Sequence, residues 1–314
     1  MDDYRIEPYT EARKEEWDAF VEKARNATFL FKRGYMDYHA DRFRDHSLMV
    51  YRKGKLYALL PANRRGDTLH SHQGLTYGGL VMSEKTTASG VMDAFRAIHE
   101  CLKAEGIRKV VYKALPCIYH RMPSQEDLYA LFRLTNARLI GRSLSSTLCQ
   151  ESKPRFAESR KSGIRKATAR AVTIRQSDDY AAFWEILEAN LQHKYGVAPV
   201  HTLEEIRLLA ARFPENIRLH LACQGEKTLG GTVMYLAGRV AHTQYISASP
   251  EGKAAGALDL LFDTLINREY ADVPVFDFGP STEDMGRYLN ESLLFQKENF
   301  GGRGMVYDVY EYDL

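Results

Sequence analysis

The sequence predicts an α/β (α+β) fold of two similar lobes, each a mixed, mostly antiparallel sheet flanked by helices. Three observations predict it. The chain has 314 residues, which is long for one hydrophobic core and suits two domains of ordinary size. Apolar residues alternate in some segments and recur at helical spacing in others. The same order of segments occurs in both halves, which indicates one duplicated domain.

In the first half, alternation and turn residues predict strands, and apolar stripes predict helices. The expected elements are a strand at 4–9, helices at 11–24 and 33–43, strands at 47–51 and 56–61, a helix at 87–105, a strand at 109–112, a helix at 125–135 and a strand at 138–149. Gly106 directly follows one helix, as is typical of a helix end.

The second half repeats this order. The expected elements are a strand at 172–175, helices at 180–192 and 203–212, strands at 217–223, 229–236 and 240–247, a helix at 255–268, a strand at 275–278, a helix at 282–294 and a strand at 305–312. Thr202 and Glu205 form a capping box for the second of these helices. Antiparallel hairpins with one helical crossover predict a mixed sheet covered on both faces.

The predicted domains are an N-terminal lobe at 1–150, a basic linker helix at 151–170 and a C-terminal lobe at 171–314. Within the linker, Glu158 is the single acid beside seven basic residues: Lys153, Arg155, Arg160, Lys161, Arg165, Lys166 and Arg170. The first interpretation is a solvated helix. The alternative is a surface for a polyphosphate, a tRNA or a nucleotide-linked acceptor.

Composition narrows the class of protein. Hydrophobic residues make up 45% of the chain and charged residues 27%, which is typical of a globular protein. The net charge of +2 excludes a polycation, so any nucleic-acid contact needs a local basic patch. The start of the chain is polar, unlike a signal peptide, and no apolar run approaches the roughly 20 residues of a membrane span. Four scattered cysteines predict reduced thiols and a cytoplasmic location.

Two motifs near the C-terminus carry the strongest local signal. One is Val275-Phe276-Asp277-Phe278-Gly279, and the other is Lys297-Glu298-Asn299-Phe300-Gly301. They resemble the FemAB peptidyltransferase group, whose members carry a strand ending in Asp-Phe-Gly, then a helix, then Phe-Lys-x-x-Phe-Gly. In this chain Gln296 separates Phe295 from the lysine.

The resemblance extends over nearly the whole chain. The order of elements is similar to that of the GNAT acyltransferases, and residues 162–167 resemble the segment where the second FemAB lobe begins. This implies tandem GNAT lobes that transfer an acyl or aminoacyl group from a thioester or a tRNA ester to an amine. Cell-envelope or polysaccharide precursor synthesis is the implied setting.

The resemblance also implies a catalytic lysine. The FemAB group places the motif lysine, here Lys297, beside the acyl carbonyl, and we expect Lys297 to point into a cleft between the lobes. Amide formation creates an oxyanion, which a fixed ammonium would stabilise. The alternative is a surface lysine near a helix end that interacts with the helix dipole alone.

The donor, acyl-CoA or aminoacyl-tRNA, is expected at Lys253, Gly256 and Ala257. GNAT enzymes bind the CoA pyrophosphate with Gln/Arg-x-x-Gly-x-Gly/Ala at a helix start, whereas Leu258 here replaces the last small residue. FemAB relatives also lack the full loop, because their donor is aminoacyl-tRNA. The alternative is a Gly- and Ala-rich helix start that serves packing alone.

An amine or nucleotide-linked sugar acceptor is expected between the lobes. The candidate substrate-binding residues are Tyr35, His39, Tyr77, Lys194, Tyr195 and Tyr245. His39 stands where FemAB proteins have a lysine that binds a nucleotide-linked sugar, and Lys194-Tyr195 falls where the family contacts its acceptor. The alternative for the aromatic residues is core packing.

A glycine-rich loop at 70–79 carries the second catalytic candidate, His72, which would deprotonate or orient the amine. A structural turn is the alternative. His70 and His72 lack a third ligand in close spacing, so no metal is expected. Hydrolase, Walker and Rossmann motifs are missing from the sequence. The rival function is a non-catalytic ligand-binding or scaffold protein on a degenerate GNAT fold, which the degenerate donor loop favours.

Overall fold

The computed structural model describes residues 4–314, apart from the side chain of Tyr195, and these residues form two compact units. Unit 1 contains the described residues up to Ser143, with Glu283–Tyr288 and Val306–Leu314. Unit 2 contains Leu144–Thr282 and Leu289–Met305. The chain passes from one unit to the other at four points, 143–144, 282–283, 288–289 and 305–306, so the units differ in their bounds from the expected lobes. The division at 150 and 170 stays a prediction.

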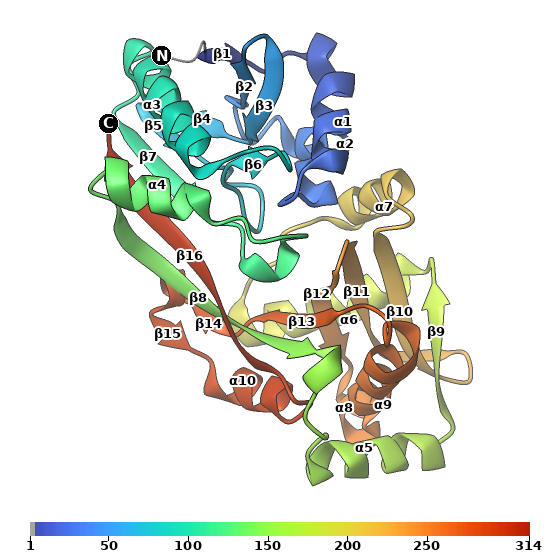
Figure 1. Ribbon diagram of the computed structural model, residues 1–314. Coiled ribbons are helices and arrows are strands. Elements are labelled where there is room, and N and C mark those ends of the chain that lie inside the picture. Colours follow the sequence, from blue (N-terminus) through green and yellow to red (C-terminus); the bar gives the residue numbers. More distant parts are fainter. Residues whose placement is uncertain (1–3) are drawn as a thin grey trace. The chain divides into compact units, whose positions relative to one another are not determined.

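Unit 1 is built on short strands and four helices (Figure 1). One antiparallel sheet has the order β1 (Tyr4–Pro8), β2 (Leu48–Arg52), β3 (Lys55–Leu60), β6 (Val81–Met82). A second group has β4 (Asn63–Arg65) antiparallel to β5 (Thr68–His70), and β5 parallel to β7 (Lys109–Lys113). The helices are α1 (Lys14–Lys23), α2 (Arg33–Met36), α3 (Ala88–Ala104) and α4 (Glu126–Leu134).

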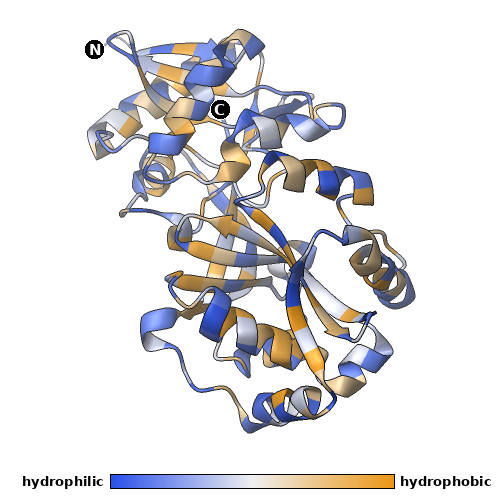
Figure 2. Ribbon diagram, turned by 90° about the vertical axis from the view of Figure 1, so that its right-hand side faces the viewer, coloured by the Kyte–Doolittle hydropathy of each residue, from blue (hydrophilic) through white to orange (hydrophobic). Residues whose placement is uncertain are grey.

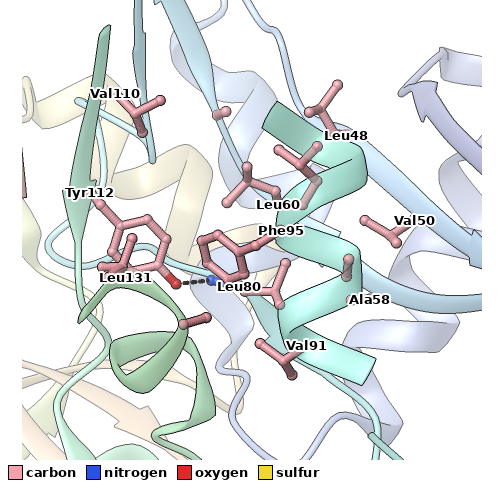
Figure 3. Packing of buried hydrophobic residues seen from close by; sticks show 14 of the residues in the cluster. Leu48, Val50, Ala58, Leu60, Leu80, Val91, Phe95, Val110, Tyr112 and Leu131 are labelled. Carbon is pink, nitrogen blue, oxygen red and sulfur yellow. Dashed lines mark hydrogen bonds between the residues drawn. The ribbon is translucent and has the colours of Figure 1, made fainter. Parts of the chain in front are cut away.

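The core of unit 1 lies between α3 and the strands (Figure 3). Phe95 of α3 packs there with Leu48, Leu60 and other fully buried aliphatic side chains. Tyr112 brings a polar atom into this core and satisfies it, because its hydroxyl accepts a hydrogen bond from the Leu80 amide at 2.7 Å. The stripe on α3 that the sequence predicts is therefore the face that builds the core.

Unit 2 has one larger mixed sheet. Its strand order is β8 (Arg138–Cys149), β13 (Val275–Pro280), β12 (Val240–Ala248), β11 (Lys227–Ala237), β10 (Ile217–Gln224), β9 (Val172–Ser177). Its helices are α5 (Glu158–Ala169), α6 (Tyr180–Tyr195), α7 (Leu203–Arg212), α8 (Pro250–Ala255), α9 (Ala257–Thr264) and α10 (Glu291–Glu298). The last strand, β16 (Arg303–Asp313), ends the chain. The capping box of α7 is confirmed.

Two neighbouring strands of unit 2 diverge and so create space for a site. All pairs in this sheet from β8 to β9 are antiparallel except β12 with β13, which is parallel. The parallel pairing ends at His242 and Asp277. Beyond these residues no pairing joins the two strands within the described chain.

Three expected helices differ from the structure. The helix at 33–43 shortens to α2 with a 3-10 turn at Asp37–His39. The helix at 255–268 is divided at Gly256, which has φ +77°. The helix at 282–294 starts instead at Glu291, after β14 (Thr282–Glu283) and β15 (Tyr288–Leu289). The reason is a turn with left-handed φ at two non-glycine residues, which a helix cannot contain.

The distribution of hydropathy follows this architecture. Hydrophobic residues gather in the strands and on the helix faces that pack against them, and hydrophilic residues occupy turns and outer helix faces (Figure 2). Between residues 4 and 314, no helix combines the length and the apolar character that crossing a membrane requires.

Candidate active site

A cavity of about 750 Å³ lies within unit 2, where β12 and β13 diverge. We call it the unit-2 cavity. Its walls come from α6, the end of β12, the α8–α9 turn and α10. Three lysines from three of these elements line it: Lys194, Lys253 and Lys297. Five of the seven site residues proposed from the sequence in this half of the chain line this cavity: Lys194, Lys253, Gly256, Ala257 and Lys297.

Lys297 is buried, with 5% of its surface exposed, so it is not the surface lysine that was the alternative interpretation. Its Nζ donates hydrogen bonds to the carbonyl oxygens of Gly279 at 2.8 Å and Pro280 at 2.9 Å. Burial lowers the pKa of this ammonium to about 8, although the Asp277 carboxylate partly opposes the shift. An ammonium has three donors. Two have acceptors among the described residues, which leaves one donor for a ligand in the cavity.

The backbone around Lys297 is shaped to hold it. β13 is irregular between Asp277 and Pro280, where it gains a residue relative to β8. Gly279 sits in this bulge with φ +73°, a conformation that favours glycine. Its N–H donates to Asp277 Oδ1 at 3.2 Å, which turns its carbonyl oxygen toward Lys297. The Asp-Phe-Gly motif and the lysine motif thus form one structure.

A buried pair of side chains, His242 and Asp277, lies near Lys297, and the sequence did not predict this pairing. His242 Nδ1 lies 2.8 Å from Asp277 Oδ2, and Ser145 Oγ donates to Asp277 Oδ1 at 2.5 Å. An ionised carboxylate only accepts hydrogen bonds, so it fixes the proton of His242 on Nδ1 and leaves Nε2 as an acceptor. Asp277 belongs to a recognised motif. His242 stands 35 residues earlier in a strand, and no local pattern connects the two.

The expected donor-binding residues lie together, but two of them already have packing partners. A Cβ built on Gly256 would lie 2.5 Å from the carbonyl oxygen of Gly163 in α5, so this side of the turn has no room for a phosphate. Ala257 is fully buried in a small cluster with Ala167 of α5. Figure 1 shows α5 beside α8 and α9. Lys253 is exposed, and its Nζ donates to Asn190 Oδ1 at 3.2 Å.

Comparison with known proteins adds to this geometry. Residues 155–288 match the model of the family described as "Acetyltransferase (GNAT) domain". This segment includes α5, the diverging strands and the α8–α9 turn. A comparison of the sequence with curated proteins finds no match.

Solved structures resemble this chain over nearly its whole length. FemX has a TM-score of 0.69 at 12% identity, covering 99% of this chain and 97% of FemX. L-PGS from Bacillus licheniformis has a TM-score of 0.61 at 10% identity, covering 94% and 90%. A tandem GNAT protein from the clavulanic acid biosynthesis pathway has a TM-score of 0.51 at 10% identity, covering 99% and 98%. These likenesses confirm the mixed α/β, GNAT-type fold, and the domain match supports acyl transfer in general.

The acceptor candidates within residues 155–288 differ in whether they line the cavity. Lys194 lines the unit-2 cavity. Tyr195 ends α6, and its side chain lies outside the described part of the chain. Tyr245 does not line the cavity: it packs against Trp184, with ring centroids 5.2 Å apart, and its hydroxyl lies 2.6 Å from His201 Nδ1.

The remaining candidates, Tyr35, His39, His72 and Tyr77, are buried in unit 1 and do not line the unit-2 cavity. The rings of His39 and His72 stack with centroids 5.3 Å apart. Tyr77 donates to Thr28 Oγ1 at 3.0 Å, and the ring of Tyr35 packs edge-on against Phe29. Burial lowers the pKa of His72 to about 3, so its imidazole is neutral at pH 7. Their roles in substrate binding and catalysis stay predictions.

No group of three or more His, Cys, Asp or Glu side chains in residues 4–314 is arranged to hold a metal ion. Within the same residues, His70 and His72 lack a third ligand that would complete a site.

Proposed function

We propose that this GNAT protein is an N-acyltransferase that uses Lys297 to stabilise the oxyanion of the tetrahedral intermediate. The observation that supports it most directly is the lysine itself. It is buried, held by two carbonyl oxygens, and lines a cavity with one donor left for a ligand. A donor that is fixed before reaction costs no reorganisation when charge develops, which is why such groups have large effects on rate.

The proposed reaction is direct transfer without a covalent enzyme intermediate. The acceptor amine attacks the acyl carbonyl carbon, and the carbonyl electron pair moves to the oxygen, which Lys297 holds. Collapse of the intermediate restores the carbonyl, breaks the bond to the thiolate or alkoxide leaving group and leaves a C–N bond. The nitrogen loses one proton, and the leaving group takes one up.

The proton of the amine needs a base, and two histidines are candidates. His72 is the candidate from the sequence, and burial lowers its pKa to about 3, which keeps it neutral at pH 7 but makes it a weak proton acceptor. His242 is the candidate from the structure, since its bond to Asp277 leaves Nε2 as an acceptor. The variants His72→Gln and His242→Gln would separate them, because only loss of the true base would lower the rate while leaving the fold and donor binding intact.

Two donor classes are proposed. The GNAT domain match supports an acyl-CoA thioester, and the likeness to FemX and L-PGS supports an aminoacyl-tRNA ester. The proposed acceptor is a small amine or a nucleotide-linked amino sugar in cell-envelope or polysaccharide precursor synthesis. The basic face of α5, with Arg165 and Lys166 exposed, is the proposed surface for a tRNA or another polyphosphate.

The experiment is a matrix of acyl-CoAs and aminoacyl-tRNAs against amine acceptors, including nucleotide-linked amino sugars, with amide products detected by mass spectrometry. An enzyme should form at least one amide product at a rate that Lys297→Met lowers about 100- to 1000-fold while keeping the wild-type melting temperature. If ligands raise the melting temperature but no pair gives a product, the chain is the non-catalytic binding protein that was the rival interpretation.

A further inference from the structure

The charges around the unit-2 cavity are strongly unequal. Four of its lining side chains are cationic: Arg160, Lys194, Lys253 and Lys297. Among the lining residues that the structure describes, Asp259 is the single carboxylate. A ligand group with positive charge would therefore meet four cationic side chains and a single carboxylate.

That acidic partner is already engaged by α5. Asp259 Oδ1 accepts a hydrogen bond from Arg160 Nη1 at 2.7 Å. The other oxygen, Oδ2, is directed at Gly163, since a Cβ built on that glycine would lie 1.9 Å from it. Both carboxylate oxygens face α5, so Asp259 neutralises Arg160 and offers no counter-charge to a cationic ligand.

The rest of the lining suits an apolar group. Aliphatic and aromatic side chains from α6, β12, α9 and β13 supply it: Leu187, Leu191, Ile246, Leu258, Phe262 and Phe278. Phe262 and Phe278 pack edge to face with centroids 5.2 Å apart. Transfer of alkyl groups from water to such a surface is favourable, by about 0.8 kcal/mol for each buried CH₂.

We propose that the group transferred by this site is an uncharged, apolar acyl group and not an aminoacyl group. This inference rests on the proposed function and chooses between its two donor classes. The α-ammonium of an aminoacyl group is two bonds from the carbonyl that Lys297 would hold. It would therefore enter a cationic, partly apolar cavity without an acidic partner, where an unpaired charge is disfavoured.

The test compares two stable probes that differ by one amino group. They are N-(2-acetamidoethyl)hexanamide and N-(2-acetamidoethyl)norleucinamide, which have the same six-carbon acyl chain. Binding is measured by calorimetry at pH 6.5, where the second probe is protonated. We expect the hexanoyl probe to bind about tenfold more tightly or better. Equal or tighter binding of the norleucyl probe overturns the proposal, and so does a failure of both probes to bind.

A matched pair of variants tests the cause. Gln296→Glu adds a carboxylate to the cavity lining at an exposed position of α10, so the fold should tolerate it. Gln192→Glu makes the same change at an exposed position of α6 that does not line the cavity. The preference for the hexanoyl probe should fall severalfold in Gln296→Glu and stay unchanged in Gln192→Glu. The proposal is overturned if both variants behave alike.

The outcomes separate this inference from the proposed function, because binding is measured without turnover. Selective hexanoyl binding together with no amide product in any assay would refute the enzyme and keep the cavity's preference. Transfer of an aminoacyl group that depends on Lys297 would keep the enzyme and refute the preference.

Discussion

The two units each contain a lysine in a cradle of backbone carbonyl oxygens. In unit 1, Lys113 at the end of β7 donates to the carbonyl oxygens of His72 at 3.3 Å, Gln73 at 3.2 Å and Leu75 at 2.7 Å. In unit 2, Lys297 donates to two such oxygens. Burial lowers the pKa of both ammonium groups to about 8. The two lysines therefore share the direction and the main cause of their pKa shift.

Their hydrogen bonds differ in a way that matters for function. Lys113 uses all three of its donors to fasten a loop, so it has none left for a ligand. Lys297 uses two, and it lines a cavity. A lowered pKa therefore indicates burial at either position. The unused donor beside a cavity is what distinguishes a candidate catalytic group from a structural one.

The largest expected effect is on the rate after loss of Lys297. In Lys297→Met, turnover should fall about 100- to 1000-fold, or ~2.7–4 kcal/mol, because the oxyanion loses one donor. The measurement is the initial rate with the substrate pair found in the transfer matrix. Lys103→Met, which changes an exposed lysine of α3, should keep the wild-type rate. A Lys297→Met enzyme with nearly full activity would remove the distinction between the two lysines.

The next effect is the loss of rate at high pH. With an acceptor amine that is already neutral at pH 7, the rate should fall about tenfold per pH unit above pH 8. The sign follows from the charge: the ammonium is present below its pKa of about 8 and is lost as pH rises through that value. In Lys297→Arg the guanidinium stays charged, so any residual activity should be flat to pH 10. A wild-type profile that is flat to the same pH contradicts the assignment.

A smaller effect is expected on stability after loss of Lys113. Lys113→Met leaves three carbonyl oxygens of the 72–75 loop without their donor. Partly buried acceptors without a partner cost about 1–3 kcal/mol in the free energy of unfolding, measured by urea denaturation. The matched control is Lys109→Met on the same strand, which removes an exposed ion pair with Glu311 and should change little. Equal losses in both variants would mean that the cradle does not stabilise unit 1.

The smallest expected effect is on stability, when a glycine near a helix start in either half is replaced by alanine. Gly256→Ala should destabilise the protein by about 1–2 kcal/mol, because Gly256 has φ +77° and a Cβ there would lie 2.5 Å from the carbonyl oxygen of Gly163 in α5. In α3, a Cβ on Gly90 would meet only the hydroxyl end of Tyr57, a side chain that can move. Gly90→Ala should therefore cost less in thermal unfolding. The reverse order would show that α5 is not tightly packed on the α8–α9 turn.

Much of the site was predictable where the relevant forces act over a few residues. The capping box of α7 needs only Thr202 and Glu205, three positions apart. Apolar stripes located α3 and α6 for the same reason. The Lys-x-x-Phe-Gly motif pointed to Lys297 through its resemblance to the FemAB group, and the amides of Phe300 and Gly302 both bond to the carbonyl of that lysine within one turn. Local hydrogen bonds and side-chain periodicity depend on residues that are close together in the sequence, so the sequence predicts them.

Tertiary structure alone decided what surrounds that lysine. The bond between His242 and Asp277 joins two strands, and the engagement of Asp259 by Arg160 joins two helices 99 residues apart. The helix expected at 282 was delayed by left-handed residues whose side chains give no local warning. The sequence by itself therefore determined which residues could carry charge and chemistry. The fold decided which of those charges are already paired, since pairing depends on contacts between segments that are remote in the chain.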